Sequence, residues 1–417
     1  MISLNEAQQF VLRALTALTP VALPLQDALG CVAAEEVNAR ERVPGFSNAA
    51  MDGYALRAAD TLNESVRLSV TGSVMAGDVP AKPLGAGEAM RIMTGAPLPS
   101  GADCVCMIEE VTIDPDGRAV LIDRVVRSGE NVRHPGEDID VGQVLITPGT
   151  ELGPTQLGVL ASQGFTSLLA HPRPRVGVLS TGNELTSSPE ALPAGKVRDV
   201  NRPLLLALLR QSGFIPVDLG TVEDDAGAIA EELRRGVLAC DAVVSTGGVS
   251  VGDVDFVKTV IGELCGERAR SMQVAIRPGK PFAFGVTGSP GTPIFGLPGN
   301  PVSLLVGFEL FVRPALRLLA RHRVLERPTL NMVLDCALPR RRDGKLHLVH
   351  VVAKFHEDGR LHAERVVRGG SHLLSAIADA NVIAIVPDGD GLDIGHIVPA
   401  MILDEDRLIP TPVRSTL

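Results

Sequence analysis

Residues 175–182 read RVGVLSTG, and residues 241–248 read DAVVSTGG. Each stretch is a short apolar run, rich in β-branched residues, that ends in serine, threonine and glycine. Short apolar runs bounded by turn residues are typical of buried strands. Helical patterns lie between such runs, and this alternation predicts a doubly wound, mainly parallel α/β sheet with helices on both faces over residues 174–325.

The other elements of this α/β region are predicted from capping residues and apolar runs. Asn201 can cap a helix with a proline in its first turn, and Asp224 or Asp225 can cap a helix that ends near residue 239. A further helix is expected near residues 256–264, and a long apolar helix from Pro301. Strands are expected at Phe214–Leu219, Met272–Ile276, Phe282–Val286 and Pro293–Phe295.

The regions on either side have a different character. Ser3 and Glu6 have the form of a capping box and predict an amphipathic helix at the start of the chain. Residues 43–150 contain short apolar runs interrupted by glycine and proline, which predicts a mainly β region. Beyond residue 326, Asp-Gly pairs at 343–344 and 358–359 lie between alternating apolar runs, so they predict hairpins in a small closing β domain.

The composition indicates a globular protein of several domains. At 417 residues, the chain exceeds one ordinary core, because domains average roughly 150 residues. Its net charge of -10 provides no long-range attraction for nucleic acid or for an anionic membrane. No apolar run approaches the roughly 18 residues of a membrane span, and no basic region precedes an apolar one at the N-terminus, so a cytoplasmic protein is expected.

The six cysteines are scattered and lack the spacing of a zinc site. Reduced and mostly buried thiols are therefore expected. Cys104 and Cys106 would fall on one face of a strand, either as small core residues or as a reactive pair, and the core role is favoured.

Three predicted strands end in loops of one chemical kind. Residues 180–184 read STGNE, residues 245–253 read STGGVSVGD, and residues 296–301 read GLPGNP. Small residues and free N–H groups beside a helix start let a phosphate approach the main chain, and ligands of such sheets bind outside the carboxyl ends of the strands. One such loop is more often a simple tight turn, but three at one edge predict a phosphate cradle. Its residues are Ser180, Thr181, Gly182, Gly247, Gly248, Ser250, Pro298, Gly299, Asn300 and Pro301.

Charged residues accompany these loops. Mg²⁺ binds through one or two carboxylates plus phosphate oxygens, and this is the expected use of the acidic residues at this edge, with helix capping as the alternative for Asp224 and Asp225. The turn RPGKP places Arg277 and Lys280 where they can clamp a phosphate or another tetrahedral oxyanion, unless it is only a solvated basic turn. The acidic residues are Glu184, Asp224, Asp225, Asp253 and Asp255.

Read together, eight segments resemble the molybdopterin molybdenumtransferase family, the family of MoeA and of the E domain of gephyrin. They occur in the expected order over nearly the whole chain. The segments are SNAAMDGYALR (47–57), RIMTGAPLPSGAD (91–103), GENVRHPGED (129–138), STGNEL (180–185), DVNR (199–202), STGGVSVGD (245–253), RPGKPFAFG (277–285) and GLPGNPVS (296–303).

The resemblance implies an elongated homodimer whose subunits have four parts. The first is a linking domain made of residues 1–42 and 139–173, and the second is an inserted, mainly β domain at residues 43–138. The third, at residues 174–325, is an α/β molybdopterin-binding domain with a fold like that of molybdopterin adenylyltransferase. The fourth, at residues 326–417, is a small C-terminal β-barrel.

The resemblance also implies the reaction: adenylated molybdopterin and molybdate, with Mg²⁺, yield molybdenum cofactor and AMP. Carried over by motif, the catalytic residues are Asp52, Thr94, Glu184, Asp224, Asp225, Asp255 and Lys280, of which Glu184, Asp224 and Asp255 would hold Mg²⁺. Asp52 and Thr94 would act on the pocket of the partner subunit, which makes each site composite. Two positions depart from the pattern of many relatives: Asn183 replaces aspartate and Arg277 replaces lysine. Further implied partners are a molybdopterin adenylyltransferase, downstream molybdoenzymes and a cofactor nucleotidyltransferase.

Other functions are weighed against this one. A molybdopterin adenylyltransferase would share the α/β domain but not the regions on either side, and a gephyrin-like scaffold would bind proteins without turnover. A nucleotide amidase or pyrophosphatase would not account for the segments at residues 47–57 and 129–138. The sequence lacks G-x-G-x-x-G, a Walker motif and a G-x-S-x-G elbow, so a dinucleotide site, a P-loop and covalent catalysis are not expected. The choice between molybdate and tungstate is left open.

Overall fold

The computed structural model describes residues 1–63, 65–80, 82–248, 256–288, 291–366 and 374–409. The chain divides into two compact units. The first unit contains residues 1–22, 30–32 and 169–417, and the second contains residues 23–29 and 33–168. Among the described residues, no helix is long and apolar enough to cross a membrane.

The first unit is built on a six-stranded sheet in the order β17-β14-β18-β22-β21-β19. The first four strands are parallel, and the last two pair antiparallel at one edge. This confirms the predicted mainly parallel α/β domain. The strands are β14 (Arg175–Thr181), β17 (Ile215–Val222), β18 (Ala242–Thr246), β19 (Ala269–Gln273), β21 (Pro281–Val286) and β22 (Pro293–Leu297).

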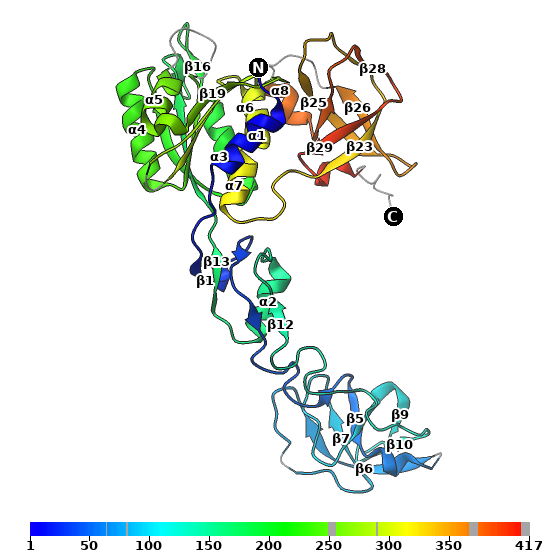
Figure 1. The fold of residues 1–417 in the computed structure, drawn as a ribbon. Coiled ribbons are helices and arrows are strands. Elements are labelled where there is room, and N and C mark those ends of the chain that lie inside the picture. Colours follow the sequence, from blue (N-terminus) through cyan, green and yellow to red (C-terminus); the bar gives the residue numbers. More distant parts are fainter. Residues whose placement is uncertain (64, 81, 249–255, 289–290, 367–373, 410–417) are drawn as a thin grey trace. The chain divides into compact units, whose positions relative to one another are not determined.

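Helices cover both faces of this sheet, as predicted (Figure 1). Phe282 of the sheet stacks on Phe311 at 4.3 Å between ring centroids within the core of one face. Leu179 and Val243 point to the other face, where Leu233 packs against them. Helices α1 (Leu4–Arg13), α3 (Asn201–Gln211), α6 (Pro301–Gly307) and α7 (Arg313–Leu319) cover the first face, and α4 (Ala226–Ala239) and α5 (Phe256–Cys265) cover the second.

Two of the predicted helix caps are confirmed. The hydroxyl of Ser3 accepts the N–H of Glu6 at 3.1 Å at the start of α1. The Asp225 carboxylate accepts the N–H of Ala228 at 2.8 Å at the start of α4. The helix that begins at Pro301 passes through one π-helical segment, Phe308–Val312, before it continues as α7.

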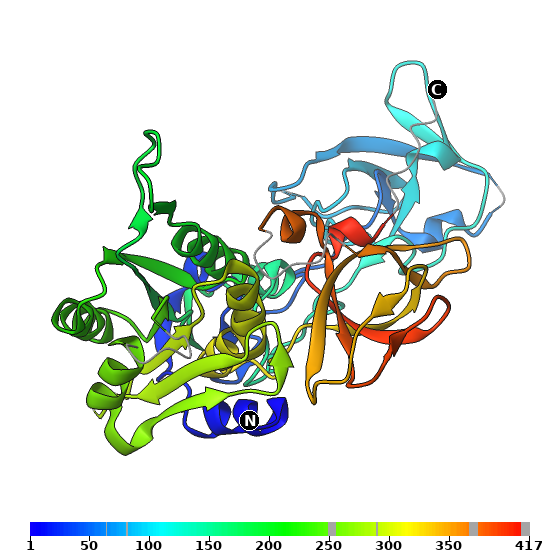
Figure 2. The same ribbon diagram turned by 90° about the horizontal axis from the view of Figure 1, so that it is seen from above.

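The first unit also contains a closed β-barrel, as predicted for the C-terminal region (Figure 2, orange and red). Its strands run in the order β25-β26-β23-β29-β27, and the pairing of β27 with β25 closes the barrel. The short strand β20 (Ile276–Arg277) pairs with β25 and so attaches the α/β domain to the barrel. The barrel strands are β23 (Thr329–Leu334), β25 (Leu346–Phe355), β26 (Leu361–Val366), β27 (Val382–Val386) and β29 (Ile397–Ile402).

One of the two predicted hairpins is correct. Residues 358–359 join β25 to β26, which pair antiparallel. The hairpin predicted at residues 343–344 is wrong, because the flanking strand β24 (Leu338–Pro339) pairs with β28 (Gly391–Leu392) instead of β25. The guanidinium of Arg340 binds the Asp343 carboxylate and the carbonyl of Lys345, so this connection folds around a buried cation and not as a tight turn.

The second unit is mainly β, as predicted. Its six-stranded sheet has the order β8-β5-β7-β6-β10-β9. Cys104 and Cys106 lie in β8, both free and fully buried, which confirms their core role. Burial raises the pKa of the Cys106 thiol to about 11. The strands are β5 (Gly53–Leu56), β6 (Val66–Val74), β7 (Glu88–Ile92), β8 (Cys104–Met107), β9 (Val111–Ile113) and β10 (Ala119–Ile122).

Shorter elements complete the chain, and the predicted four-part boundaries remain a prediction. In the stretch that would form the linking domain, three strands pair in the order β1-β13-β2, and β12 pairs with β3. These elements are β1 (Val21–Pro24), β2 (Val32–Ala33), β3 (Val37–Asn38), β12 (Val144–Ile146), α2 (Pro154–Ser162) and β13 (Ser167–His171). Elsewhere lie β4 (Asn48–Ala49) with β11 (Val132–Arg133), β15 (Leu185–Thr186) with β16 (Val197–Arg198), and α8 (Leu374–Asp379).

Candidate functional site

The three predicted loops meet at the carboxyl ends of β14, β18 and β22. Gly247 has a φ of +95°, and a Cβ placed on it would lie only 2.3 Å from the carbonyl oxygen of Thr181. A Cβ on Gly299 would lie 3.7 Å from the Cα of Gly247. Because no side chain of the described residues separates these points, the main chains at Thr181, Gly247 and Gly299 lie against one another. Gly248 also has a positive φ, of +59°, beside Thr181.

Asn201 joins two of these loops, and its predicted capping role is wrong. Its side-chain NH₂ donates to the Thr246 hydroxyl at 2.9 Å and to the carbonyl of Gly299 at 2.7 Å. The Asp199 carboxylate instead accepts the N–H of Arg202 in the first turn of α3, at 3.1 Å. Since Asp199 caps the start of α3, the side-chain amide of Asn201 can bond to the loops. Sequence reasoning missed this role, although the segment DVNR was the available signal.

Three buried polar atoms at this junction have no hydrogen-bond partner among the described residues. They are the hydroxyl oxygens of Thr181 and Ser245 and the side-chain carbonyl oxygen of Asn201. An unsatisfied buried polar group costs about 1–3 kcal/mol, and a bound water or ligand can remove this cost. Their position where the loops meet is typical of a binding site.

A buried carboxylate holds the framework behind the loops. The side chain of Asp199 is 1% exposed and accepts hydrogen bonds from the hydroxyls of Ser180 at 3.1 Å and Thr221 at 3.0 Å. It also accepts a hydrogen bond from the Nε–H of Arg202 at 3.1 Å. These contacts tie the ends of β14 and β17 to the start of α3. Ser180, predicted to bind substrate, is thus fully buried and directed to this carboxylate.

Two of the predicted acidic residues border the first loop. The Asp224 N–H donates to the side-chain oxygen of Asn183 at 3.0 Å, and the Asn183 N–H is 3.4 Å from the Asp224 carboxylate. The exposed carboxylate of Glu184 folds over Gly182, where a Cβ would lie 2.7 Å from one of its oxygens. Asp225 is used as the cap of α4, so Asp224 is the member of the pair that faces the loop. Ser250, Asp253 and Asp255 lie outside the described residues.

The predicted cationic turn lies beside the third loop. Gly279 has a φ of +93°, and its Cβ position is 3.4 Å from the carbonyl oxygen of Ser303 in α6. The turn that contains Arg277 and Lys280 therefore packs on the helix that begins at Pro301. Arg277 is 66% exposed and Lys280 is partly buried. Asn300, predicted to bind substrate, uses its side chain to cap α6, where it accepts the Val302 N–H at 3.1 Å. Pro298 is buried in the same loop.

In the second unit, the predicted pair Asp52 and Thr94 are in direct contact. Both the hydroxyl and the backbone N–H of Thr94 donate to one Asp52 oxygen, each at 2.7 Å. The hydroxyl bond, then the N–H bond and, less strongly, the charge of Arg91 hold the pKa of the Asp52 carboxyl below its ordinary value. Asp52 is exposed. The unit thus presents a persistently charged carboxylate to solvent.

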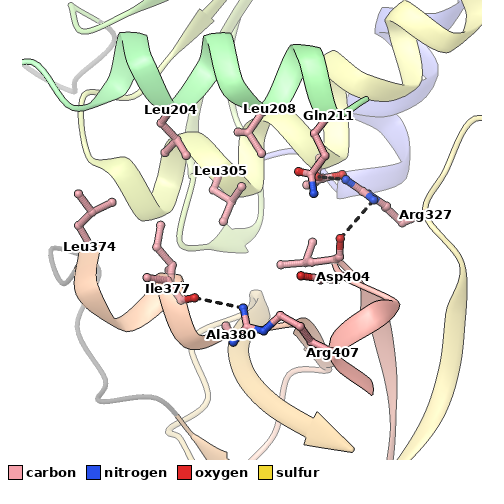
Figure 3. A pocket seen from close by; sticks show the side chains of 13 residues that line it. Leu204, Leu208, Gln211, Leu305, Arg327, Leu374, Ile377, Ala380, Asp404 and Arg407 are labelled. Carbon is pink, nitrogen blue, oxygen red and sulfur yellow. Dashed lines mark hydrogen bonds and ion pairs between the residues drawn. The ribbon is translucent and has the colours of Figure 1, made fainter. Parts of the chain in front are cut away.

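A separate pocket lies among α3, α6, α8 and the segment near residue 404 (Figure 3). Leu204, Leu208 and Leu305 form its apolar wall. At its edge, Arg327 makes a bidentate pair with Glu309, with both contacts at 3.0 Å. None of the residues predicted to act in the site lines this pocket. We therefore place the candidate site at the loops.

Comparisons with known proteins identify the family of the chain. Three protein-family models match the chain. The family model of the MoeA N-terminal region (domain I and II) matches residues 2–164. The family model of a probable molybdopterin binding domain matches residues 177–318, and the family model of the MoeA C-terminal region (domain IV) matches residues 334–403. The crystal structure of the molybdopterin biosynthesis MoeA protein of Pyrococcus horikoshii superposes with a TM-score of 0.77 at 27% identity, covering 96% of this chain and 100% of that chain.

Similar sequences extend over nearly the full length. The molybdopterin molybdenumtransferase of Haemophilus influenzae is 35% identical over 94% of this chain and 96% of its own length. That of Bacillus subtilis is 34% identical over 92% of this chain and 90% of its own length. On this similarity, the chain belongs to the molybdopterin molybdenumtransferase family.

Proposed function

We propose that this protein is a molybdopterin molybdenumtransferase, a transferase that inserts molybdate into adenylated molybdopterin and releases AMP. One observation carries the proposal: the main chains of the loops at Thr181, Gly247 and Gly299 meet without an intervening side chain. Such a surface lets a phosphorylated ligand reach backbone N–H groups. The relatives named molybdopterin molybdenumtransferase support the choice of substrate.

The residues of the site act by positioning and by charge. The loops would hold the phosphoanhydride, and Lys280 with Arg277 would balance the charge of phosphate and molybdate beside α6. Release of AMP at this site needs no side-chain nucleophile. Fixed cations and backbone N–H dipoles would stabilise the negative charge on the leaving phosphate.

The donor set beside the first loop fits a Mg²⁺ ion. The Asp224 carboxylate lies 3.4 Å from the N–H of Asn183, and a Cβ on Gly182 would lie 2.7 Å from a carboxylate oxygen of Glu184, so both acids lie beside this loop. Mg²⁺ uses one or two carboxylates and completes its shell with water and phosphate oxygens. Glu184 and Asp224 would hold the ion, with Asp255 as a further ligand, and the ion would supply charge neutralisation at the phosphoanhydride.

The second unit would complete the site in a homodimer. Asp52 with Thr94 would act on the pocket of a partner subunit. Equal amounts of Asp52→Ala and Lys280→Ala chains, unfolded and refolded together, then form mixed dimers with one intact composite site. Recovery of activity above that of either variant alone supports the arrangement. Activity that stays at the level of the separate variants contradicts it.

The reaction itself is tested with adenylated molybdopterin, Mg²⁺ and molybdate, while AMP and active cofactor are measured together. Molybdate-dependent AMP release is expected from the wild type and a strong loss from Glu184→Ala or Asp224→Asn, with Glu223→Ala, an exposed neighbouring acid, as the matched control. Absence of molybdate-dependent AMP release overturns the proposal. Consumption of ATP with molybdopterin would identify an adenylyltransferase, and binding without turnover would identify a scaffold.

A further inference from the structure

A cluster of metal-ligand residues lies in the barrel, outside the site described above. Asp335 directly follows β23, His356 directly follows β25, and His362 lies in β26. Strands β23 and β26 are parallel neighbours in which Leu334 pairs with Ala363. This pairing brings Asp335 beside His362, and the hairpin between β25 and β26 brings His356 to the same place. The three residues are therefore positioned by the barrel itself.

The donor atoms of these three residues lie close together. The rings of His356 and His362 stack with centroids 4.2 Å apart and planes 6° apart. A carboxylate oxygen of Asp335 lies 2.9 Å from Nδ1 of His362. One ligand atom from each residue lies within 4.8 Å of the other two. The three residues could therefore hold one metal ion.

A second layer of carboxylates supports the imidazoles. Asp358 lies 3.1 Å from Nε2 of His362. Glu364 lies 3.7 Å from Nε2 of His356. Histidine ligands of metal ions commonly donate their second N–H to a carboxylate, which fixes the tautomer and the ring orientation. His362 has such a partner in Asp358, and Glu364 lies within ion-pair distance of His356.

We propose that Asp335, His356 and His362 bind one divalent transition-metal ion of the Zn²⁺ class. Two imidazole nitrogens and one carboxylate oxygen are a donor set for Zn²⁺ or Co²⁺, whereas Mg²⁺ and Ca²⁺ select oxygen ligands. Three protein ligands leave a coordination position for water.

The ion would join the turn between β25 and β26 to the end of β23. Its effect is therefore on the stability of the barrel, since a ligand that binds only the folded state stabilises it by mass action. None of the three residues is among those of the proposed transferase site. Metal binding at this site is therefore independent of the proposed transferase function.

The test uses the full-length protein after treatment with a chelator and buffer exchange. Titration with Zn²⁺ in a calorimeter, and with Co²⁺ followed by its visible absorption, should each show one equivalent bound. His356→Ala and His362→Ala should abolish this binding, and Asp358→Asn should weaken it by about 10- to 100-fold, as expected for a residue that orients a ligand. His396→Ala, another histidine of the barrel domain, should bind normally.

Thermal unfolding separates metal binding from damage to the fold. Zn²⁺ should raise the melting temperature of the wild type and of His396→Ala, and should leave that of His362→Ala unchanged. His362→Gln serves as a second variant, because glutamine preserves most of the side-chain volume. A wild-type protein that binds no Zn²⁺ at one equivalent, or a His362→Gln variant that binds it with unchanged affinity, overturns the proposal.

Discussion

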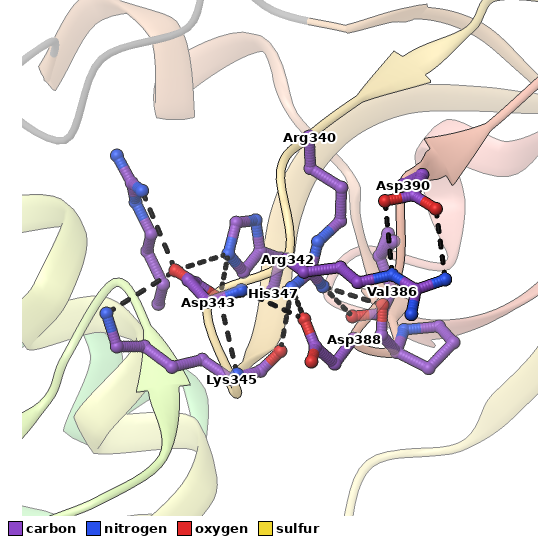
Figure 4. Close-up of polar contacts among 10 residues, drawn as sticks. Arg340, Arg342, Asp343, Lys345, His347, Val386, Asp388 and Asp390 are labelled. Atoms are coloured by element: carbon purple, nitrogen blue, oxygen red, sulfur yellow. Dashed lines mark hydrogen bonds and ion pairs between the residues drawn. The ribbon is translucent and has the colours of Figure 1, made fainter.

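The guanidinium of Arg277 lies 3.8 Å from the carboxylate of Asp343, and this ion pair joins the cationic turn to the barrel. Figure 4 shows Asp343 with its other partners. Arg340 at 3.1 Å, His347 at 3.2 Å and Lys345 at 3.4 Å contact the same carboxylate. Burial alone raises the pKa of Asp343, but hydrogen bonds and charge from His347 and Lys345 outweigh it and lower the pKa to about 2. The carboxylate therefore remains charged near neutral pH and holds Arg277 in place.

We expect Asp343→Asn to weaken substrate binding more than turnover. Loss of the Asp343 charge releases the exposed side chain of Arg277 from this ion pair. Because an exposed ion pair changes an equilibrium constant by up to about fivefold, substrate affinity should fall by no more than this. KM for adenylated molybdopterin should rise within that range while kcat changes little. Asp390→Asn is the matched control, because it removes an exposed pair with Arg342 at 3.0 Å in the same domain. Equal kinetic effects of the two variants would contradict the role of Asp343.

Gly247→Ala should abolish most activity, whereas Gly220→Ala should not. Both glycines have a positive φ, +95° and +88°, so both variants carry the roughly 1–2 kcal/mol cost of an L-residue in the left-handed region. Only the alanine at position 247 also collides with the Thr181 carbonyl, since Gly220 has open space around it. A displacement of about 1 Å in a catalytic site can reduce the rate about 100-fold. Measured AMP release and melting temperatures separate the two effects, and equal activity of the two variants would argue against the loop junction.

Asn201→Ala should reduce activity beyond its effect on stability. Removal of the amide leaves the carbonyl of Gly299 without this donor, at a cost of about 1–3 kcal/mol. Asn381→Ala is the control, because Asn381 is 1% exposed and bonds both the N–H and the carbonyl of Ala353 in the barrel, at 2.8 and 2.7 Å. Denaturant unfolding should show comparable destabilisation for both. Only Asn201→Ala should lose AMP release, and normal turnover in a folded Asn201→Ala protein would refute its role at the loops.

His350 should make the barrel acid-sensitive. Burial lowers the pKa of this imidazole to about 4, from an ordinary value of 6.5. As the pH falls from 6.5 towards 4, the unfolded chain takes up a proton that the folded chain excludes, so stability decreases by up to about 3 kcal/mol. The loss is complete below pH 4, and above pH 6.5 the group contributes nothing. Unfolding free energies of wild type and His350→Leu, measured across this range, should diverge, and parallel curves would contradict the prediction.

Much of the fold was predictable because it depends on short-range patterns. The apolar run before Thr181, the cap at Asp225 and the cap at Ser3 each act within a few residues, and the structure has all three. The candidate loops were also visible, because glycines after strands of one parallel sheet must lie at one edge. The hairpin predicted at residues 343–344 is wrong because strand pairing does not depend on short-range patterns. A turn motif predicts a local bend, but partner choice depends on strands that are distant in the sequence.

The sequence by itself determined the alternation of strands and helices, the position of the glycine loops and the family, since these follow from local periodicity and from motif order. Only the tertiary structure decided which side chains act together. The sequence predicts Asn201 as a helix cap, but Asp199 accepts the N–H of the first helical turn in its place. Likewise, Asp335 meets His362 only because β23 pairs with β26 in one register. Contacts across strands depend on pairing register and on competition between donors, and neither is encoded within a short stretch of chain.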